Sequence, residues 1–249
     1  MLSQTRRQKI AQYVQDYKTV TVQDLVQVFD SSEATIRRDL KQLEEDKQIT
    51  RVHGGAIAKQ NLSGEDFFSD KLTRNAEAKA RIGAFAASLV SSGETIYLDA
   101  GTTTRQMITH LPQDILVVTN SLSIANQLVQ HMIETIIIGG KVKQATDAIV
   151  GHQALKQLED YHFSKAFMGV NAIDLKFGMT TPDSQEAAIK QQAMQQSLRI
   201  YHLADASKFD QVTFAAVNPL DVGSLITVDL PDALYQRYHN ELAMKVVTN

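Results

Sequence analysis

The chain has 249 residues, enough for two domains of ordinary size, and its 43% apolar and 21% charged residues are typical of a folded, water-soluble protein. It has no cysteine, which excludes disulfides and thiolate metal sites, and no apolar run approaches the roughly 20 residues that cross a bilayer. The net charge of −3 does not by itself indicate a nucleic-acid partner, since residues 1–58 carry nine basic and eight acidic side chains.

Three short helices are predicted in the first 46 residues. Residues 3–17 have apolar side chains at helical spacing. Thr21 and Asp24 have the spacing of a capping box, with a short acidic residue in the reciprocal role, and this box opens a second helix. Ser32 can cap a third helix, which extends to about Asp46.

A β-hairpin is predicted directly after the third helix. Residues 49–52 alternate like a strand, residues 53–55 (His-Gly-Gly) form a turn, and residues 56–58 return. Two strands joined by a glycine turn, following three helices, predict a winged helix-turn-helix domain over residues 1–58.

The third helix has small and basic side chains on the face away from its core. If Ile36, Leu40 and Leu43 are buried, the opposite face can enter a major groove, where arginine contacts guanine through two hydrogen bonds or holds a phosphate. The helix start can face a phosphate, and the hairpin can contact the flanking backbone. The predicted DNA-binding residues are Ser32, Ala34, Thr35, Arg37, Arg38, Lys41, Arg51, His53 and Gly54.

The rest of the chain has the texture of an α/β domain. Residues 59–75 are polar and mixed and are interpreted as a linker, and a helix is predicted from about 75 to 91. From residue 95 onward, β-branched apolar runs alternate with helix-compatible segments, which predicts a mainly parallel sheet covered on both faces over residues 76–249. The predicted strands are 95–99, 115–120, 135–138, 166–170, 199–205 and 225–229. The predicted helices between them are 103–111, 121–131, 151–160 and 184–198.

Ligands of open α/β sheets bind beyond the carboxyl ends of the strands. Here those ends carry small, hydroxyl, amide and lysine residues, which suit a polyol phosphate. The sharpest motif is DAGTTT at 99–104, where Gly101 permits a tight turn and the threonines open a helix whose backbone N–H groups can bind an anion. A capped turn without a ligand is an equal alternative for this motif alone. It is neither a GxGxxG nor a Walker loop, so no cofactor is predicted.

Two further segments add groups that can bind a polyol phosphate. Residues 178–182 lead into a helix that carries Glu186 and Lys190, which could instead pair on a surface. Lys208 follows a strand end, from which an ammonium can reach a phosphate, although a lone lysine there is usually solvated. The scattered histidines predict no metal site. The predicted effector-binding residues are Asp99, Gly101, Thr102, Thr103, Thr104, Asn120, Ser121, Gly139, Gly140, Asn171, Glu186, Lys190 and Lys208.

Both halves of the chain resemble the DeoR family of repressors. The run TIRRDL at 35–40, followed at this distance by HGGA at 53–56, is highly specific for that family. The segments DAGTTT, IIIGG, GMTTPDSQEAAIK and ADASKF fall in the family's order, so the resemblance covers nearly the whole chain.

The resemblance implies a winged helix bound to double-stranded operator DNA, usually as an oligomer, so we expect a homodimer or homotetramer. It also implies a carboxy-terminal domain, similar in fold to ribose-5-phosphate isomerase, that senses a phosphorylated sugar. We expect a cytoplasmic repressor of a sugar-utilisation operon with no membrane partner, and the sequence leaves the sugar phosphate, the operator and activation open.

Two other functions are weighed against this one. A sugar-phosphate isomerase with an accessory winged helix would depend on Glu186 and Lys208. The isomerase pattern, however, places carboxylates where residues 169–172 are Gly-Val-Asn-Ala, so we expect a sensor and not an enzyme. Glu186 is expected to meet a ligand hydroxyl or a lysine. A winged helix used only for protein contacts is disfavoured by Arg37 and Arg38 on the exposed helix face.

Overall fold

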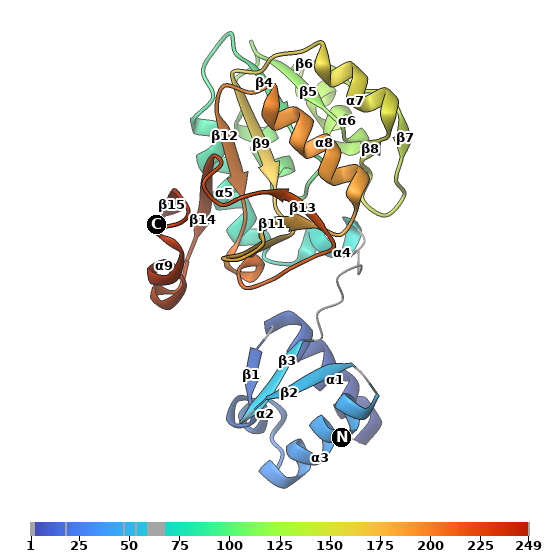
Figure 1. Ribbon diagram of the computed structural model, residues 1–249, viewed down its shortest axis with the longest axis vertical. Coiled ribbons are helices and arrows are strands. Elements are labelled where there is room, and N and C mark those ends of the chain that lie inside the picture. The colour runs from blue at the N-terminus through green and yellow to red at the C-terminus, as the bar shows by residue number, and fades with distance from the viewer. Residues whose placement is uncertain (1–2, 18, 47, 53, 59–67, 249) are drawn as a thin grey trace. The chain divides into compact units, whose positions relative to one another are not determined.

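The computed structural model divides the chain into two compact units, residues 1–61 and 62–249 (Figure 1). The residues it describes are 3–17, 19–46, 48–52, 54–58 and 68–248. Among these residues, no helix combines the length and the apolar character that a membrane crossing needs.

The first unit is a winged helix, as predicted. Its elements are the helices α1 (Ser3–Tyr17), α2 (Val22–Phe29) and α3 (Glu33–Glu45) and the strands β1 (Thr19–Thr21), β2 (Ile49–Val52) and β3 (Gly55–Ala58). The capping box is confirmed, because the Thr21 side chain accepts the Asp24 N–H and the Asp24 carboxylate accepts the Thr21 N–H at 2.9 Å. Ser32 caps α3 by accepting the Thr35 N–H. The predicted core stripe of α3 is buried.

The sheet of this unit has one strand more than the predicted hairpin. β1 pairs antiparallel with β3, which gives the order β1-β3-β2. Gly54 has φ +83°, which the turn requires, and a Cβ at Gly55 would lie 2.0 Å from the Val20 carbonyl oxygen. The two glycines therefore serve a turn and a close strand approach, respectively. His53, which was predicted to contact DNA, lies outside the described residues.

The second unit is built on a sheet of seven parallel strands in the order β15-β14-β12-β9-β4-β5-β6 (Figure 1). The strands of this sheet are β4 (Thr95–Leu98), β5 (Leu116–Thr119), β6 (Glu134–Ile137), β9 (Lys165–Gly169), β12 (Ile200–Leu203), β14 (Ser224–Val228) and β15 (Met244–Val247). All six predicted strands are present, and the parallel sheet is confirmed. β15 and the smaller sheets were not predicted, and strands such as β7, β8 and β10 have only two or three residues, too few for a clear apolar period.

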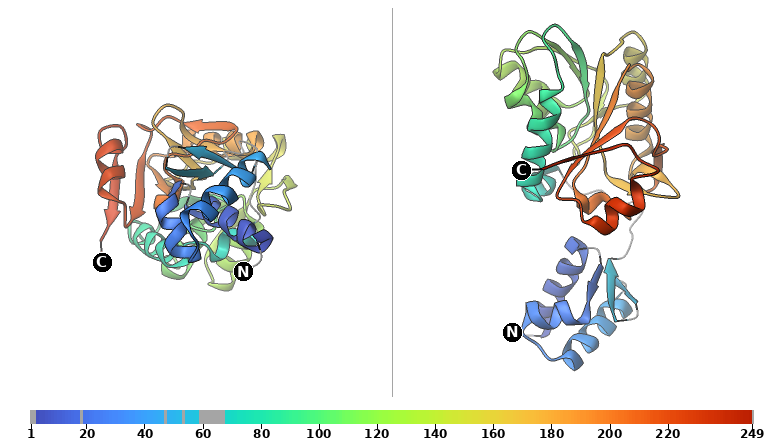
Figure 2. Two further views of the ribbon diagram at one scale, coloured as in Figure 1. Left: turned by 90° about the horizontal axis from the view of Figure 1, so that it is seen from below. Right: turned by 90° about the vertical axis from the view of Figure 1, so that its left-hand side faces the viewer.

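Helices cover both faces of the large sheet (Figure 2). One apolar core contains Ile82, Met107 and Ile124, from the helices on one face, and the other contains Ala154 and Ile189, from the opposite face. The helical elements are α4 (Phe68–Thr73), α5 (Ala76–Ser88), η1 (Thr104–His110), α6 (Leu122–Gln130), α7 (His152–Glu159), α8 (Ser184–Gln195), η2 (Ala206–Lys208) and α9 (Asp232–Tyr238). The remaining strands are β7 (Lys141–Val142) with β8 (Ile149–Val150), and β10 (Ala172–Asp174) with β11 (Gly178–Thr181) and β13 (Ala215–Asn218).

Two local features differ from the sequence interpretation. The segment predicted as a helix at 103–111 is the 3-10 helix η1, whose i+3 bonds tighten the turn after β4. Within the segment 59–75, interpreted as a linker, residues 68–73 form α4. α4 was not predicted, because a helix of this length has too few turns for a clear apolar period.

Candidate functional site

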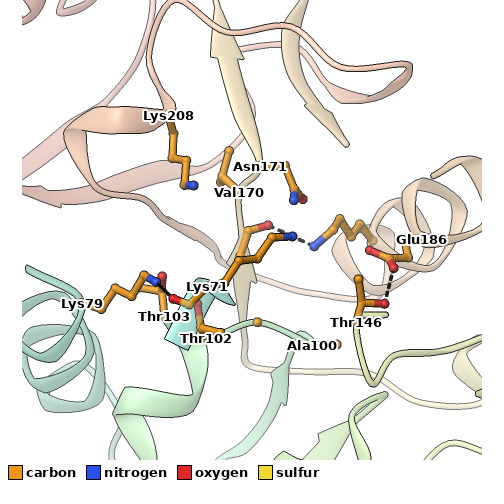
Figure 3. Close-up of a pocket in the computed structure, with 13 residues that line it drawn as sticks. Lys71, Lys79, Ala100, Thr102, Thr103, Thr146, Val170, Asn171, Glu186 and Lys208 are labelled. Carbon is orange, nitrogen blue, oxygen red and sulfur yellow. Dashed lines mark hydrogen bonds between the residues drawn. The ribbon is translucent and has the colours of Figure 1, made fainter. Parts of the chain in front are cut away.

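A pocket opens where the sheet topology changes direction. β4 lies between β5 and β9, so the chain leaves the centre of the sheet on two sides, and the carboxyl ends of β4 and β9 meet there. The open space measures about 580 Å³ including solvent at its mouth. Its lining residues are Lys71, Lys79, Ala100, Gly101, Thr102, Thr103, Thr146, Gly169, Val170, Asn171, Glu186, Lys190 and Lys208 (Figure 3).

A buried ion pair forms the base of this pocket. The Lys190 ammonium binds the Asp99 carboxylate and donates to the Gly169 carbonyl at 3.0 Å, and the Gly169 N–H donates to Asp99 at 2.9 Å. Burial raises the pKa of Asp99, although the Lys190 ammonium opposes that rise. Asp99 therefore does not line the pocket but holds Lys190 and the end of β9 in place.

Glu186 brings a buried carboxylate to one wall of the pocket. Its Oε1 accepts from the Thr146 hydroxyl at 2.6 Å and from the Lys143 ammonium at 2.9 Å. Burial alone would raise the pKa of Glu186, but the Thr146 hydrogen bond and the nearby Lys190 and Lys143 charges outweigh it and lower the pKa. Glu186 is therefore ionised at neutral pH and can accept hydrogen bonds from hydroxyl groups.

Three lysines from three separate elements also line the pocket. Lys71 comes from α4, Lys79 from α5 and Lys208 from η2. The Lys79 ammonium donates to the Lys71 carbonyl oxygen. Burial, together with the Lys208 charge, lowers the pKa of Lys79 to about 8. Concentrated positive charge of this kind is stabilised by an anion.

A small network of hydrogen bonds places Lys208. Asp205 accepts the Ser207 N–H at 2.9 Å and so shapes the turn of η2. The Asn75 side-chain amide donates to the same carboxylate at 3.0 Å, which ties the start of α5 to η2. Lys79 and Lys208 are thereby held at one place although they lie far apart in the sequence.

Some of the predicted effector residues support the pocket without lining it. The Thr104 hydroxyl lies 2.7 Å from the Asp99 carbonyl oxygen and closes the turn after β4. Asn120 accepts the Ala100 N–H at 3.0 Å, and Ser121 caps α6. The predicted residues that do line the pocket are Gly101, Thr102, Thr103, Asn171, Glu186, Lys190 and Lys208.

The two glycines of the IIIGG segment lie away from the pocket. The Gly139 N–H donates to Gln157 of α7 at 2.9 Å. A Cβ at Gly140 would lie 2.7 Å from the Val150 carbonyl oxygen of β8. These glycines allow the β7–β8 hairpin to pack against α7, so the structure gives them a packing role.

Lys71, Lys79 and Thr146 line the pocket but were missed from the sequence. Lys79 carried a usable signal, because it shares the apolar face of its helix with Ile82 and Ala86 and only 4% of it is exposed. Lys71 and Thr146 lie in polar segments and carry no such signal. In the described part of the chain, no group of three or more histidine, aspartate or glutamate side chains could hold a metal ion.

The exposed face of α3 carries the predicted DNA-binding side chains. Ser32, Ala34, Arg37, Arg38 and Lys41 are exposed, and Thr35 is half-buried. The Arg38 side chain has no ion pair or hydrogen bond within the described part of the chain. Arg51 and Gly54 are exposed on the wing. The structure thus brings the described members of the predicted set to α3 and the neighbouring wing.

Arg6 has a different role from these residues. Its guanidinium binds the buried Asp39 carboxylate at 2.7 Å. This pair joins α1 to the inner face of α3 and so fixes the helix whose outer face carries Arg38.

Known proteins match both units. Residues 6–61 match the family model described as a DeoR-like helix-turn-helix domain, and residues 74–229 match the DeoR C terminal sensor domain. The uncharacterized HTH-type transcriptional regulator FruR of Bacillus subtilis is 39% identical over 249 residues, covering 99% of each chain. The putative aga operon transcriptional repressor of Escherichia coli O157:H7 is 32% identical and covers 90% of this chain and 85% of its own. A solved ribose 5-phosphate isomerase A from Methanocaldococcus jannaschii has a TM-score of 0.41 at 17% identity, covering 54% of this chain and 55% of its own.

Proposed function

Because the chain belongs to the DeoR family of transcriptional regulators, we propose that it represses a sugar-utilisation operon and that a phosphorylated sugar in the sensor pocket modulates operator binding. The family consists of regulators, and the chain is not an enzyme. Its partner is operator DNA, so the proposed location is the cytoplasm. A dimer or tetramer is proposed because two half-sites multiply affinity and specificity.

The arrangement of polar side chains around the pocket supports a phosphate ester of a polyol as the effector, with Lys143 and Lys190 adding positive charge beside Glu186. Lys79, Lys208 and Thr103 lie on one side of the pocket and Glu186 and Thr146 on the other (Figure 3). Ammonium and hydroxyl groups suit a phosphate, whereas an ionised carboxylate repels it and accepts sugar hydroxyls. The phosphate is therefore assigned to the lysine side and the sugar hydroxyls to the Glu186 side.

The effector acts only through a difference in affinity between two states of the protein. A ligand that bound the DNA-competent and DNA-incompetent states equally would shift nothing. On the DNA side, the proposed contacts are the predicted residues of α3 and the wing, with Arg38 available for a base edge and Arg37, Lys41 and Arg51 for phosphates.

The proposal is tested by a mobility-shift assay on the DNA upstream of the protein's own gene, repeated with a panel of sugar phosphates and the matching free sugars. We expect a shift that one phosphate changes and its free sugar does not. A shift that no phosphate in the panel changes would count against the sensor role. If neither this DNA nor selected genomic fragments shift at low salt, the regulator role fails.

Effector affinity is expected to fall as pH rises from 7 to 9. Lys79 has a pKa of about 8, so its ammonium loses its proton in this range, while a phosphate monoester is already a dianion. An anion favours the charged form of Lys79, so binding raises this pKa and takes up protons near pH 8. Isothermal titration calorimetry in two buffers of different ionisation enthalpy measures that uptake. A Lys79→Met variant should bind weakly and without proton uptake, and equal uptake by this variant would contradict the assignment.

A further inference from the structure

A hollow lies between α3 and the wing in the first unit. The open space measures about 490 Å³ including solvent at its mouth, and its lining residues are Val22, Arg37, Leu40, Arg51, Val52, Gly54 and Gly55. Leu40 and Val22 are buried and give it an apolar floor. Two guanidinium groups, one from the helix and one from the wing, stand beside that floor. The hollow therefore combines apolar surface with positive charge.

Each of these arginines is paired with a carboxylate of α3. Nε and Nη2 of Arg37 donate to Oε1 of Glu33 at 2.8 and 2.6 Å. Nη1 of Arg51 lies 3.9 Å from Glu44 Oε2, and the Glu44 carboxylate also accepts the Arg51 N–H at 3.1 Å. The side chains of Arg37 and Glu33 are 52% and 59% exposed, so water screens their attraction and the partners can exchange.

We propose that this hollow binds one sugar–phosphate segment of the DNA backbone, and that Glu33 and Glu44 occupy its arginines in the free protein. The inference rests on the proposed function. A deoxyribose is apolar enough to pack on the floor, and a phosphodiester matches the guanidinium groups in shape and charge. DNA binding then includes an exchange of partners in which phosphate replaces carboxylate.

Because of this exchange of partners, the neighbouring Arg37 and Arg38 contribute differently to DNA binding. Nε and Nη2 of Arg37 are engaged by Glu33, so a phosphate that binds this edge of the guanidinium displaces the carboxylate, whereas Arg38 has no ionic partner in the described chain. Glu33 therefore weakens DNA binding through Arg37, in addition to repelling the DNA as any negative charge would. The two carboxylates are affinity-setting residues that contact the arginines and not the DNA.

A double-mutant cycle between Glu33 and Arg37 tests the proposal. Binding to a short random-sequence duplex is measured by fluorescence anisotropy at low salt, because a phosphate contact does not depend on base sequence. Glu33→Gln should tighten binding about fivefold, since it removes both the competitor and one like charge. In the Arg37→Ala background, the same substitution should raise the affinity for DNA less than twofold. Asp46→Asn, at the end of the same helix and paired only with Gln42 among described residues, should gain less than twofold in either background.

The outcomes separate this inference from the proposed function. An unmodified chain that binds no duplex refutes both. A chain that binds, but in which Glu33→Gln gains equally with and without Arg37, acts through net charge alone and overturns the inference. Circular dichroism shows whether each variant is folded. Glu44→Gln combined with Arg51→Ala gives a second double-mutant cycle, in which the same non-additivity in DNA affinity is expected. Glu44 also holds the wing backbone.

Discussion

Replacing Lys190 by methionine is expected to lower the free energy of unfolding of the second unit by about 3–5 kcal/mol, because the variant buries a carboxylate without its counter-ion. The side chains of Lys190 and Asp99 are only 5% and 2% exposed, so the carboxylate that remains is largely shielded from water. Urea denaturation of the full chain, followed through the unfolding of the second unit, measures the loss.

The pH dependence of this variant gives an independent check. The folded state raises the pKa of Asp99, and losing Lys190 raises it further, so the folded state binds this proton more tightly than the unfolded state does. The loss should therefore shrink as pH falls from neutral toward about 4, the ordinary pKa of an unfolded aspartate. At lower pH, protonation of Glu186 and Asp183, whose pKa values are lowered in the fold, destabilises the protein again.

Asp99→Asn combined with Lys190→Met is the matched control. This pair of substitutions removes both charges, so most of the lost stability should return. If the double variant is no more stable than Lys190→Met alone, the buried charge is not the cause of the loss.

Replacing Arg38 by alanine is expected to weaken operator binding by about 1–3 kcal/mol, which is roughly 5- to 150-fold. Arg38 is exposed on α3 and its side chain is not engaged within the described chain. Affinity is measured by fluorescence anisotropy on the DNA fragment that shifts in the mobility-shift assay and on a random-sequence duplex. If Arg38 contacts a base edge, operator binding should fall far more than random binding.

The control and the salt dependence decide how Arg38 acts. Lys156→Ala removes one exposed positive charge from α7 of the sensor unit and should change neither affinity measurably. If Arg38 contacts a phosphate instead, its loss should weaken binding to both DNAs alike. The slope of log affinity against log salt concentration should then fall in magnitude by about one. An Arg38→Ala variant that binds both DNAs as well as the unmodified chain would remove α3 from the proposed interface.

The sequence predicts the elements of this fold well wherever the signal is local. The capping box at Thr21, the cap at Ser32 and the turn after β4 depend on residues within a few positions of one another. The long strands carry continuous apolar runs because both faces of the sheet are covered. Strands β7 and β10 are two and three residues long, and such strands take their conformation from tertiary pairing.

The pocket could be predicted only in part, because the position of strand ends identifies an edge of the sheet but not the direction of each side chain. Thr104 and Asn120 lie at that edge, yet they bind backbone groups beneath the pocket. Lys71 reaches the pocket from a helix that precedes the sheet in the chain, and Thr146 reaches it from a loop. No spacing rule connects these two residues to the strand ends.

The strand order also determines when each part can fold as the chain is synthesised. The winged helix is closed by strands that end at Ala58, and its contacts are local, so it can fold early. β4 receives its partner β9 only after residue 165 has been made, and the pocket is complete only after Lys208. A nascent chain can therefore form α3 and the wing well before it forms the sensor pocket. A chain interrupted between the two would carry the proposed DNA-binding surface without the site proposed to regulate it.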